Sequence, residues 1–226
     1  ALIAIIVLGS SPTVTGVGAL LGGLVSGAII LACAGGIRVT GIRVVLVGIG
    51  CSAALRAVNS LLIVKAPLEA AQRAQLWSAG SFSGVTLTRL MPLLIVIGAV
   101  VVVCAVFAVP LGLVAMGDDV ATGLGVRVRR TRVLLIIVAI LLVASATSVA
   151  GPVAFVALAA PHVAHRLCGG GGVGFTSSAL VGALLVLVSD VCAQRLVAPA
   201  ELPVGVVTGV VGGVYLLWLL IREVRS

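Results

Sequence analysis

The chain has 226 residues, of which 62% are hydrophobic and 9% are charged, and its net charge is +8. A soluble domain carries about 25% charged residues, so this composition excludes a soluble globular protein. Residues 90–114 and 133–149 form apolar runs of the length that spans a bilayer, for which roughly 20 residues suffice. The sequence therefore predicts an all-α integral membrane protein, a polytopic helical bundle.

Charge, proline and glycine clusters divide the chain into one short apolar run, residues 2–8, and about seven expected spans. The chain begins inside that run without a basic leader, so we expect that the natural N-terminal helices precede it. The expected spans are 14–34, 44–64, 90–114, 133–149, 152–167, 179–197 and 204–221.

Basic residues predict the orientation of these spans. If the C-terminus is cytoplasmic, alternation places nine Lys and Arg residues inside and four outside, in accord with the positive-inside rule. The positive charge then needs no nucleic-acid partner, although it would suggest one in a soluble protein. The cytoplasmic set is Arg38, Arg43, Arg127, Arg129, Arg130, Arg132, Arg166, Arg222 and Arg225, and the outer set is Lys65, Arg73, Arg89 and Arg195.

The cytoplasmic loop after residue 114 carries a pattern typical of a short helix. Asp118 is a candidate N-cap, and Gly125 is a candidate C-terminal glycine. A loop helix with Ala121 and Leu124 on one face could dock into a groove of another protein. The alternative is an ordinary solvated loop.

Residues 150–162 contain the signals of an interrupted helix. Gly151 and Pro152 stand where a helix is expected to begin, and Pro161 is expected to kink or end its membrane part, beside His162.

His162, His165 and Cys168 are spaced three apart and fall near one helix face, which is compatible with a metal site. The alternative is that they lie at the cytoplasmic end of a span beside Arg166, without a carboxylate or a second cluster. We expect no metal site.

The glycine-rich segment 169–174 superficially resembles a phosphate-binding loop. Such a loop needs a lysine before its Ser or Thr, and Phe175 stands there. The sequence therefore argues against ATP binding by this chain.

Two charged residues, Arg56 and Asp190, fall inside apolar runs, where a charge is a functional candidate by default. The alternative is a structural role, in which polar groups of neighbouring helices satisfy these two charges. Because Asp190 is the one acid at membrane depth, paired acid–base groups are missing and we expect no catalytic residues.

Several segments together resemble the FecCD permeases, which are the membrane subunits of iron-siderophore, haem and vitamin B12 importers. The resemblance covers essentially the whole chain. The matching pieces are 117–126 (GDDVATGLGV), 150–162 (AGPVAFVALAAPH), Ser189-Asp190 with Arg195, 198–208 (APAELPVGVVT), and Trp77 with Gly80-Ser81 and Ser83-Gly84.

The resemblance implies a type II ABC importer permease, a single transmembrane domain over residues 1–226 in the cytoplasmic membrane of a bacterium. The partners implied are a second permease subunit (a homodimer or a related heterodimer), two ATP-binding subunits, an extracytoplasmic substrate-binding protein and membrane lipid. Residues 117–130 match the coupling segment of the family, with Gly117, Asp118, Asp119, Ala121, Leu124 and Gly125 as its site residues. Arg195 and Glu201 are expected to dock the binding protein, since charge complementarity steers such an encounter.

No cofactor is expected on this chain, because ATP and Mg belong to the partner ATPase. The expected function is import of a ferric siderophore by alternating access, with haem or vitamin B12 as alternative substrates. The alternatives from other classes are a passive channel and a membrane enzyme or metal-binding protein that uses His162, His165 and Cys168. Family members have ten helices per subunit, so the first two and most of a third are expected to be missing here.

Overall fold

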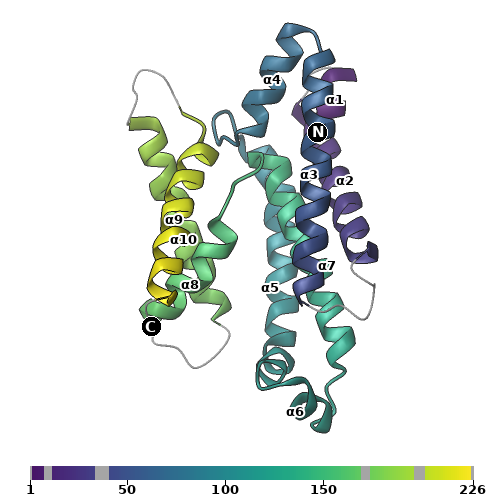
Figure 1. Cartoon of the computed structure of the whole chain (residues 1–226), viewed down its shortest axis with the longest axis vertical. Coiled ribbons are helices and arrows are strands. Elements are labelled where there is room, and N and C mark those ends of the chain that lie inside the picture. Colours follow the sequence, from purple (N-terminus) through teal and green to yellow (C-terminus); the bar gives the residue numbers. More distant parts are fainter. Residues whose placement is uncertain (1, 8–11, 34–40, 169–173, 196–201, 225–226) are drawn as a thin grey trace. The chain divides into compact units, whose positions relative to one another are not determined.

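A computed structural model describes residues 2–7, 12–33, 41–168, 174–195 and 202–224, which form ten α-helices and no strand (Figure 1). The all-α prediction is therefore confirmed for the described residues. The helices are α1 (Leu2–Val7), α2 (Pro12–Cys33), α3 (Gly41–Lys65), α4 (Leu68–Ser78), α5 (Leu87–Ala115), α6 (Asp118–Gly123), α7 (Val128–Ala150), α8 (Val156–Cys168), α9 (Phe175–Arg195) and α10 (Val204–Val224).

The chain divides into two compact units. Unit 1 comprises residues 1–75 and 86–149, and unit 2 comprises residues 76–85 and 150–226. Unit 1 contains α1 to α3, most of α4, and α5 to α7. Unit 2 contains the end of α4 with the segment that follows it, and α8 to α10. The single domain expected over the whole chain stays a prediction.

Five helices among the described residues are long and apolar enough to cross a membrane, namely Val14–Cys33, Val45–Lys65, Leu90–Val114, Val128–Ala150 and Phe175–Arg195. The chain is thus a polytopic helical membrane protein. Helix α8 has only 13 residues, and the described apolar part of α10, Val204–Tyr215, is also shorter than a span. The expected total of about seven spans stays a prediction.

Within unit 1, α2 packs closely on α7 through small residues. A Cβ added at Gly23 would lie 2.8 Å from the Cβ of Ala144, and one added at Gly27 would lie 2.5 Å from a methyl carbon of Ile140. Ala144 is buried. Small residues four apart allow helix backbones to approach in this way in lipid. Gly23 and Gly27, four residues apart, therefore both lie in the contact with α7. A Cβ at Gly22 would meet no atom within 4 Å.

Valine at Gly23 is expected to lower the free energy of unfolding by about 1–3 kcal/mol, the usual cost of overpacking. Ala144 has no flexible side chain that could rotate away from the added carbon. Gly22→Val is the matched control, since it adds the same side chain one residue away into open space. Thermal unfolding in detergent tests this prediction, and equal midpoints for the two variants would contradict it.

Within unit 2, α8 packs on α9 through alanines and other small residues. Ala160 and Ala164 of α8 are buried, as are Ser189 and Ala193 of α9. A Cβ at Gly182 would lie 3.4 Å from the Cβ of Ala160. These short side chains bring the helix backbones together, again as expected for packing in a membrane.

Three glycines of unit 2 meet in what we call the glycine junction, Gly80, Gly151 and Gly205. A Cβ at Gly151 would lie 2.7 Å from the carbonyl oxygen of Trp77 and 3.0 Å from the Cα of Gly80, and one at Gly205 would meet the carbonyl oxygens of Ala79 and Pro152. The Gly205 amide donates a hydrogen bond to the Gly80 carbonyl at 3.2 Å. The junction thus joins the segment after α4 to the breaks before α8 and α10.

The helix predicted over 150–162 is interrupted as expected, but the prediction that it begins at Pro152 is wrong. Helix α7 ends at Ala150 and α8 begins only at Val156, so Pro152 lies in the connection and does not start the helix. Phe155, the residue before α8, has a φ of +64°. This value lies outside the right-handed helical region, so α8 does not extend to Phe155 or the residues before it. Pro161 lies inside α8 and does not end it. A helix in a membrane protein tolerates the loss of the one backbone hydrogen bond that proline cannot donate.

Candidate coupling segment and docking residues

The loop after α5, which the sequence predicts to be cytoplasmic, carries the short helix expected there, α6 (Asp118–Gly123) (Figure 1). Its N-cap is Gly117, with a φ of +120°, and no side chain caps the helix. The prediction that Asp118 caps α6 is therefore wrong. Asp118 is the first helical residue, and its carboxylate points to a guanidinium instead of to the backbone.

That guanidinium belongs to Arg132 of α7, whose Nη2 donates to Asp118 Oδ1 at 3.0 Å. The two side chains are 43% and 57% exposed for Arg132 and Asp118 respectively, and an exposed pair is worth about 0–1 kcal/mol. Its value is therefore positional more than energetic, since it ties the start of α6 to the first turns of α7. The sequence predicts Arg132 only as one of the cytoplasmic arginines. Four arginines lie within six residues there, and nothing in the sequence indicates which of them pairs with Asp118.

The C-terminal end of α6 is fixed by backbone hydrogen bonds. The Val126 amide donates to the Ala121 carbonyl and the Gly125 amide to the Thr122 carbonyl, both at 2.9 Å. With Gly125 at a φ of +83°, this is the Schellman arrangement that glycine favours after a helix. The predicted closure at Gly125 is confirmed.

Two apolar side chains at α6 are exposed to solvent. Val120 is 48% and Leu124 63% exposed, whereas Ala121 is fully buried. The prediction that Ala121 and Leu124 share one docking face is therefore wrong. Exposed aliphatic side chains on a short helix of fixed ends are suited to a groove of another protein. Asp119 is exposed beside them and has no ion-pair partner among the described residues.

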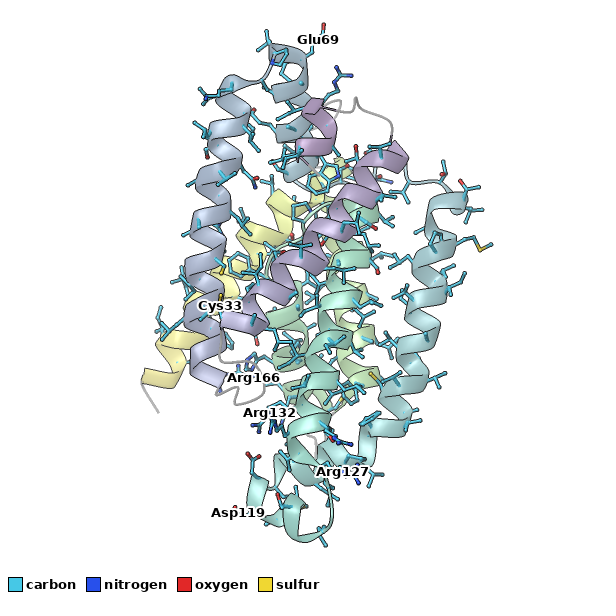
Figure 2. All side chains as sticks on the ribbon, turned by 90° about the vertical axis from the view of Figure 1, so that its right-hand side faces the viewer. Cys33, Glu69, Asp119, Arg127, Arg132 and Arg166 are labelled. Atoms are coloured by element: carbon cyan, nitrogen blue, oxygen red, sulfur yellow. The ribbon has the colours of Figure 1, made fainter. Side chains whose placement is uncertain are left out.

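A cavity of about 760 Å³, open to the outside, lies between α6 and the start of α7. Figure 2 shows Arg127 and Arg132 beside the helix that bears Asp119. The concentration of arginines makes this cavity suited to an acidic side chain of a partner. Its charged lining residues are Asp118, Arg127, Arg129, Arg130 and Arg132.

The structure describes one of the two predicted docking residues. Arg195 is the last residue of that helix and is exposed. Glu201 lies outside the described residues, so the two cannot be compared as a pair.

The two charges predicted within spans differ in their surroundings. Asp190 of α9 is half-buried and accepts a hydrogen bond from Gln194 Nε2 at 2.9 Å, so a neighbour one turn on satisfies it structurally. Arg56 is exposed in the middle of α3, with no ion pair to any described residue. Nothing in the structure assigns either residue to a pathway.

The residues considered for a metal site lie on α8. His162, His165 and Cys168 are exposed, and no group of three metal-ligating side chains is found among the residues that the structure describes. Of the predicted helix-break residues, Gly151 and Pro152 lie in the connection before α8, and Pro161 and His162 lie inside it. The glycine-rich segment falls mainly on residues 169–173, outside the described residues.

Comparison with known proteins gives one consistent family. The sequence profile of the FecCD transport family matches residues 1–222. The ferric enterobactin permease FepG of Escherichia coli is 43% identical over 225 residues, which are 100% of this chain and 68% of FepG. The probable siderophore permease YfhA of Bacillus subtilis is 37% identical over 81% of this chain and 54% of YfhA, and the hemin permease HmuU of Yersinia pestis is 33% identical over 80% and 54%.

The fold also matches a solved structure. An inward-facing metal-chelate type ABC transporter aligns with a TM-score of 0.87 at 24% identity, over 98% of this chain and 71% of that one. The expected type II importer permease fold is therefore confirmed. The chain spans only part of the length of each of these proteins.

Proposed function

Because the chain belongs to the FecCD transport family, we propose that it is a permease subunit of an ATP-driven importer whose substrate is a ferric siderophore. The observation that carries this proposal is the 43% identity to a ferric enterobactin permease along the full length of the chain. The family is a transport family, which agrees with the importer permease that the sequence resemblance implies.

In this proposal the C-terminus is cytoplasmic, because that orientation places nine basic residues inside and four outside. A second permease subunit completes the pathway, two ATP-binding subunits use ATP and Mg, and an extracytoplasmic binding protein delivers the substrate. This chain binds no cofactor of its own. Arg195, with Glu201, contacts the binding protein through complementary charge.

The segment 117–130 couples ATP hydrolysis to transport. Val120 and Leu124 insert into a groove of the ATPase, and an acidic side chain enters the arginine-lined cavity beside them. Because the Schellman turn at Gly125 and the Asp118–Arg132 pair fix both ends of α6, a displacement of the helix is passed to α5 and α7. Differential binding of the ATP states then shifts the equilibrium between two helix packings, which gives alternating access.

Uptake into proteoliposomes tests the proposal. The assembled importer, with its ATPase and binding protein, is expected to accumulate a ⁵⁵Fe-labelled siderophore only with internal ATP. Haem and cobalamin serve as competing substrates, and uptake of either without uptake of the siderophore would show the substrate assignment to be wrong. Equal uptake with and without ATP would contradict the importer itself and favour a passive channel.

A further inference from the structure

The residue before α8 has an unusual backbone conformation for an aromatic side chain. Phe155 has a φ of +64° and is the one non-glycine residue with a positive φ among those that the structure describes. The Val156 amide donates a hydrogen bond to the Ala154 carbonyl at 2.8 Å, which closes a three-residue turn around Phe155. A turn of this kind with a positive φ is rare and strained. Phe155 therefore carries backbone strain at a position where glycine would carry none.

Both ends of this turn are attached to other parts of unit 2. On one side, the Leu158 and Ala159 amides donate to the Phe155 carbonyl at 3.1 and 2.9 Å, as the first turn of α8. On the other side, the Ala150 carbonyl accepts a hydrogen bond from the Ser81 amide at 2.9 Å, which ties the connection before α8 to the glycine junction. A change in the φ of Phe155 would therefore turn α8 relative to the junction without breaking either attachment.

A glycine of α10 leaves the space that the Phe155 side chain occupies. A Cβ added at Gly212 would meet the Cβ and the ring of Phe155, and Gly212 is buried. Strained backbone persists only where the surrounding structure holds it, and this contact with α10 lies at the strained residue itself. A larger residue at position 212 would disfavour the conformation that Phe155 adopts here.

The packing beside Phe155 also leaves room for movement. A cavity of about 70 Å³ lies between α8, α9 and α10, whereas protein interiors are otherwise close-packed. The start of α8 can therefore shift toward α9 and α10 before it meets a packed side chain. The residues that line the cavity include Phe155, Ala159, Ser189, Thr208, Gly212 and Tyr215.

We propose that Phe155 is a hinge at the start of α8, which changes between the strained φ described here and a right-handed helical φ. The space at Gly212 favours the strained state, whereas the helical state adds Phe155 to α8 and turns that helix within unit 2. The inference rests on the proposed function in one respect, because ATP is the ligand expected to shift the equilibrium. A ligand does so only by binding the two states unequally.

Fluorine NMR tests this proposal, with 3-fluorotyrosine at Tyr215, the one tyrosine of the chain, which lines the cavity beside Phe155. The labelled chain is assembled with the unlabelled ATPase in nanodiscs. Two resonances are expected, and their ratio should differ between ADP and a non-hydrolysable ATP analogue. Phe155→Gly and Phe155→Ala both remove the ring, but only alanine disfavours the left-handed backbone. The ratio should therefore differ between these two variants by roughly five- to thirtyfold.

Leu158→Gly and Leu158→Ala are the matched control, because Leu158 lies inside α8 and is helical in both states. This pair should leave the ratio unchanged. Gly212→Ala should shift the ratio in the same direction as Phe155→Ala. Adding Phe155→Gly to Gly212→Ala should reverse part of that shift, because the Cβ that the new alanine would meet is then removed.

One ratio for both Phe155 variants would overturn the hinge, and one ratio in both nucleotide states would overturn its link to ATP. Either result would leave the importer proposal intact if ATP-dependent uptake is observed. Loss of uptake with a ratio that still differs between the Phe155 variants would instead contradict the importer and retain the hinge. Circular dichroism checks that the helices are retained. Should a Phe155 variant not fold, an unchanged ratio in Gly212→Ala would overturn the hinge on its own.

Discussion

Alanine at Gly151 is expected to destabilise the protein by about 2–5 kcal/mol, which combines the left-handed backbone penalty with the cost of overpacking. Gly151 has a φ of +73°, a conformation that residues with a Cβ rarely adopt. The added carbon would also lie 2.7 Å from the Trp77 carbonyl oxygen and 3.0 Å from the Cα of Gly80. Because both are backbone atoms, neither can rotate away. The yield of monodisperse protein and its unfolding midpoint measure the effect.

Gly84→Ala separates the two contributions. Gly84 also has a positive φ, +76°, but a Cβ there would meet no atom within 4 Å. This variant should therefore lose only the backbone contribution, about 1–2 kcal/mol. If Gly151→Ala and Gly84→Ala lowered the midpoint equally, the close packing of the glycine junction would contribute nothing to stability.

The glycine junction also shows where prediction from the sequence stops. The apolar runs predict the membrane helices because each run is local and long, and the turn at Gly125 is predictable because its signals lie within a few residues. Gly80, Gly151 and Gly205 are far apart in the chain, and nothing in the sequence around each one indicates the other two. The packing of these backbones is decided by tertiary contacts that no local pattern encodes.

Two further features escaped prediction for related reasons. Helix α4 mixes polar and apolar residues between two spans, so it has neither the length nor the composition of a membrane helix. The Asp118–Arg132 pair joins residues fourteen apart across a turn. The run of arginines offers Asp118 several equivalent candidates, and no local pattern in the sequence selects Arg132.

Glutamate at Leu124 together with lysine at Asp118 is expected to abolish ATP hydrolysis stimulated by the loaded binding protein. Leu124, the C-cap residue of α6, is 63% exposed, and loss of one interface anchor of this kind costs about 2 kcal/mol, roughly a thirtyfold weaker association. Lysine at Asp118 would face Arg132 with a like charge and release the start of the helix. Pull-down of the ATPase and its stimulated activity in lipid measure the two effects separately.

Leu68→Glu is the matched control for the apolar change, because Leu68 is 74% exposed on α4, away from the loop. It should leave association with the ATPase unchanged. If the double variant bound the ATPase and hydrolysed ATP as the unchanged chain does, residues 117–130 would have no coupling role. The importer proposal itself would not be affected by that result.

A charge swap tests the ion pair itself. Asp118→Arg alone should reduce coupling, because it places a second cation opposite Arg132, whose Nη2 now lies 3.0 Å from Asp118 Oδ1. Asp118→Arg with Arg132→Asp should restore part of the loss. The exposed pair contributes little to stability, so the unfolding midpoint should change little in either variant while stimulated hydrolysis changes. A midpoint that fell in parallel with the activity would instead make the pair a stabilising contact of the fold, and α6 would then reach the ATPase without needing Arg132 to position it.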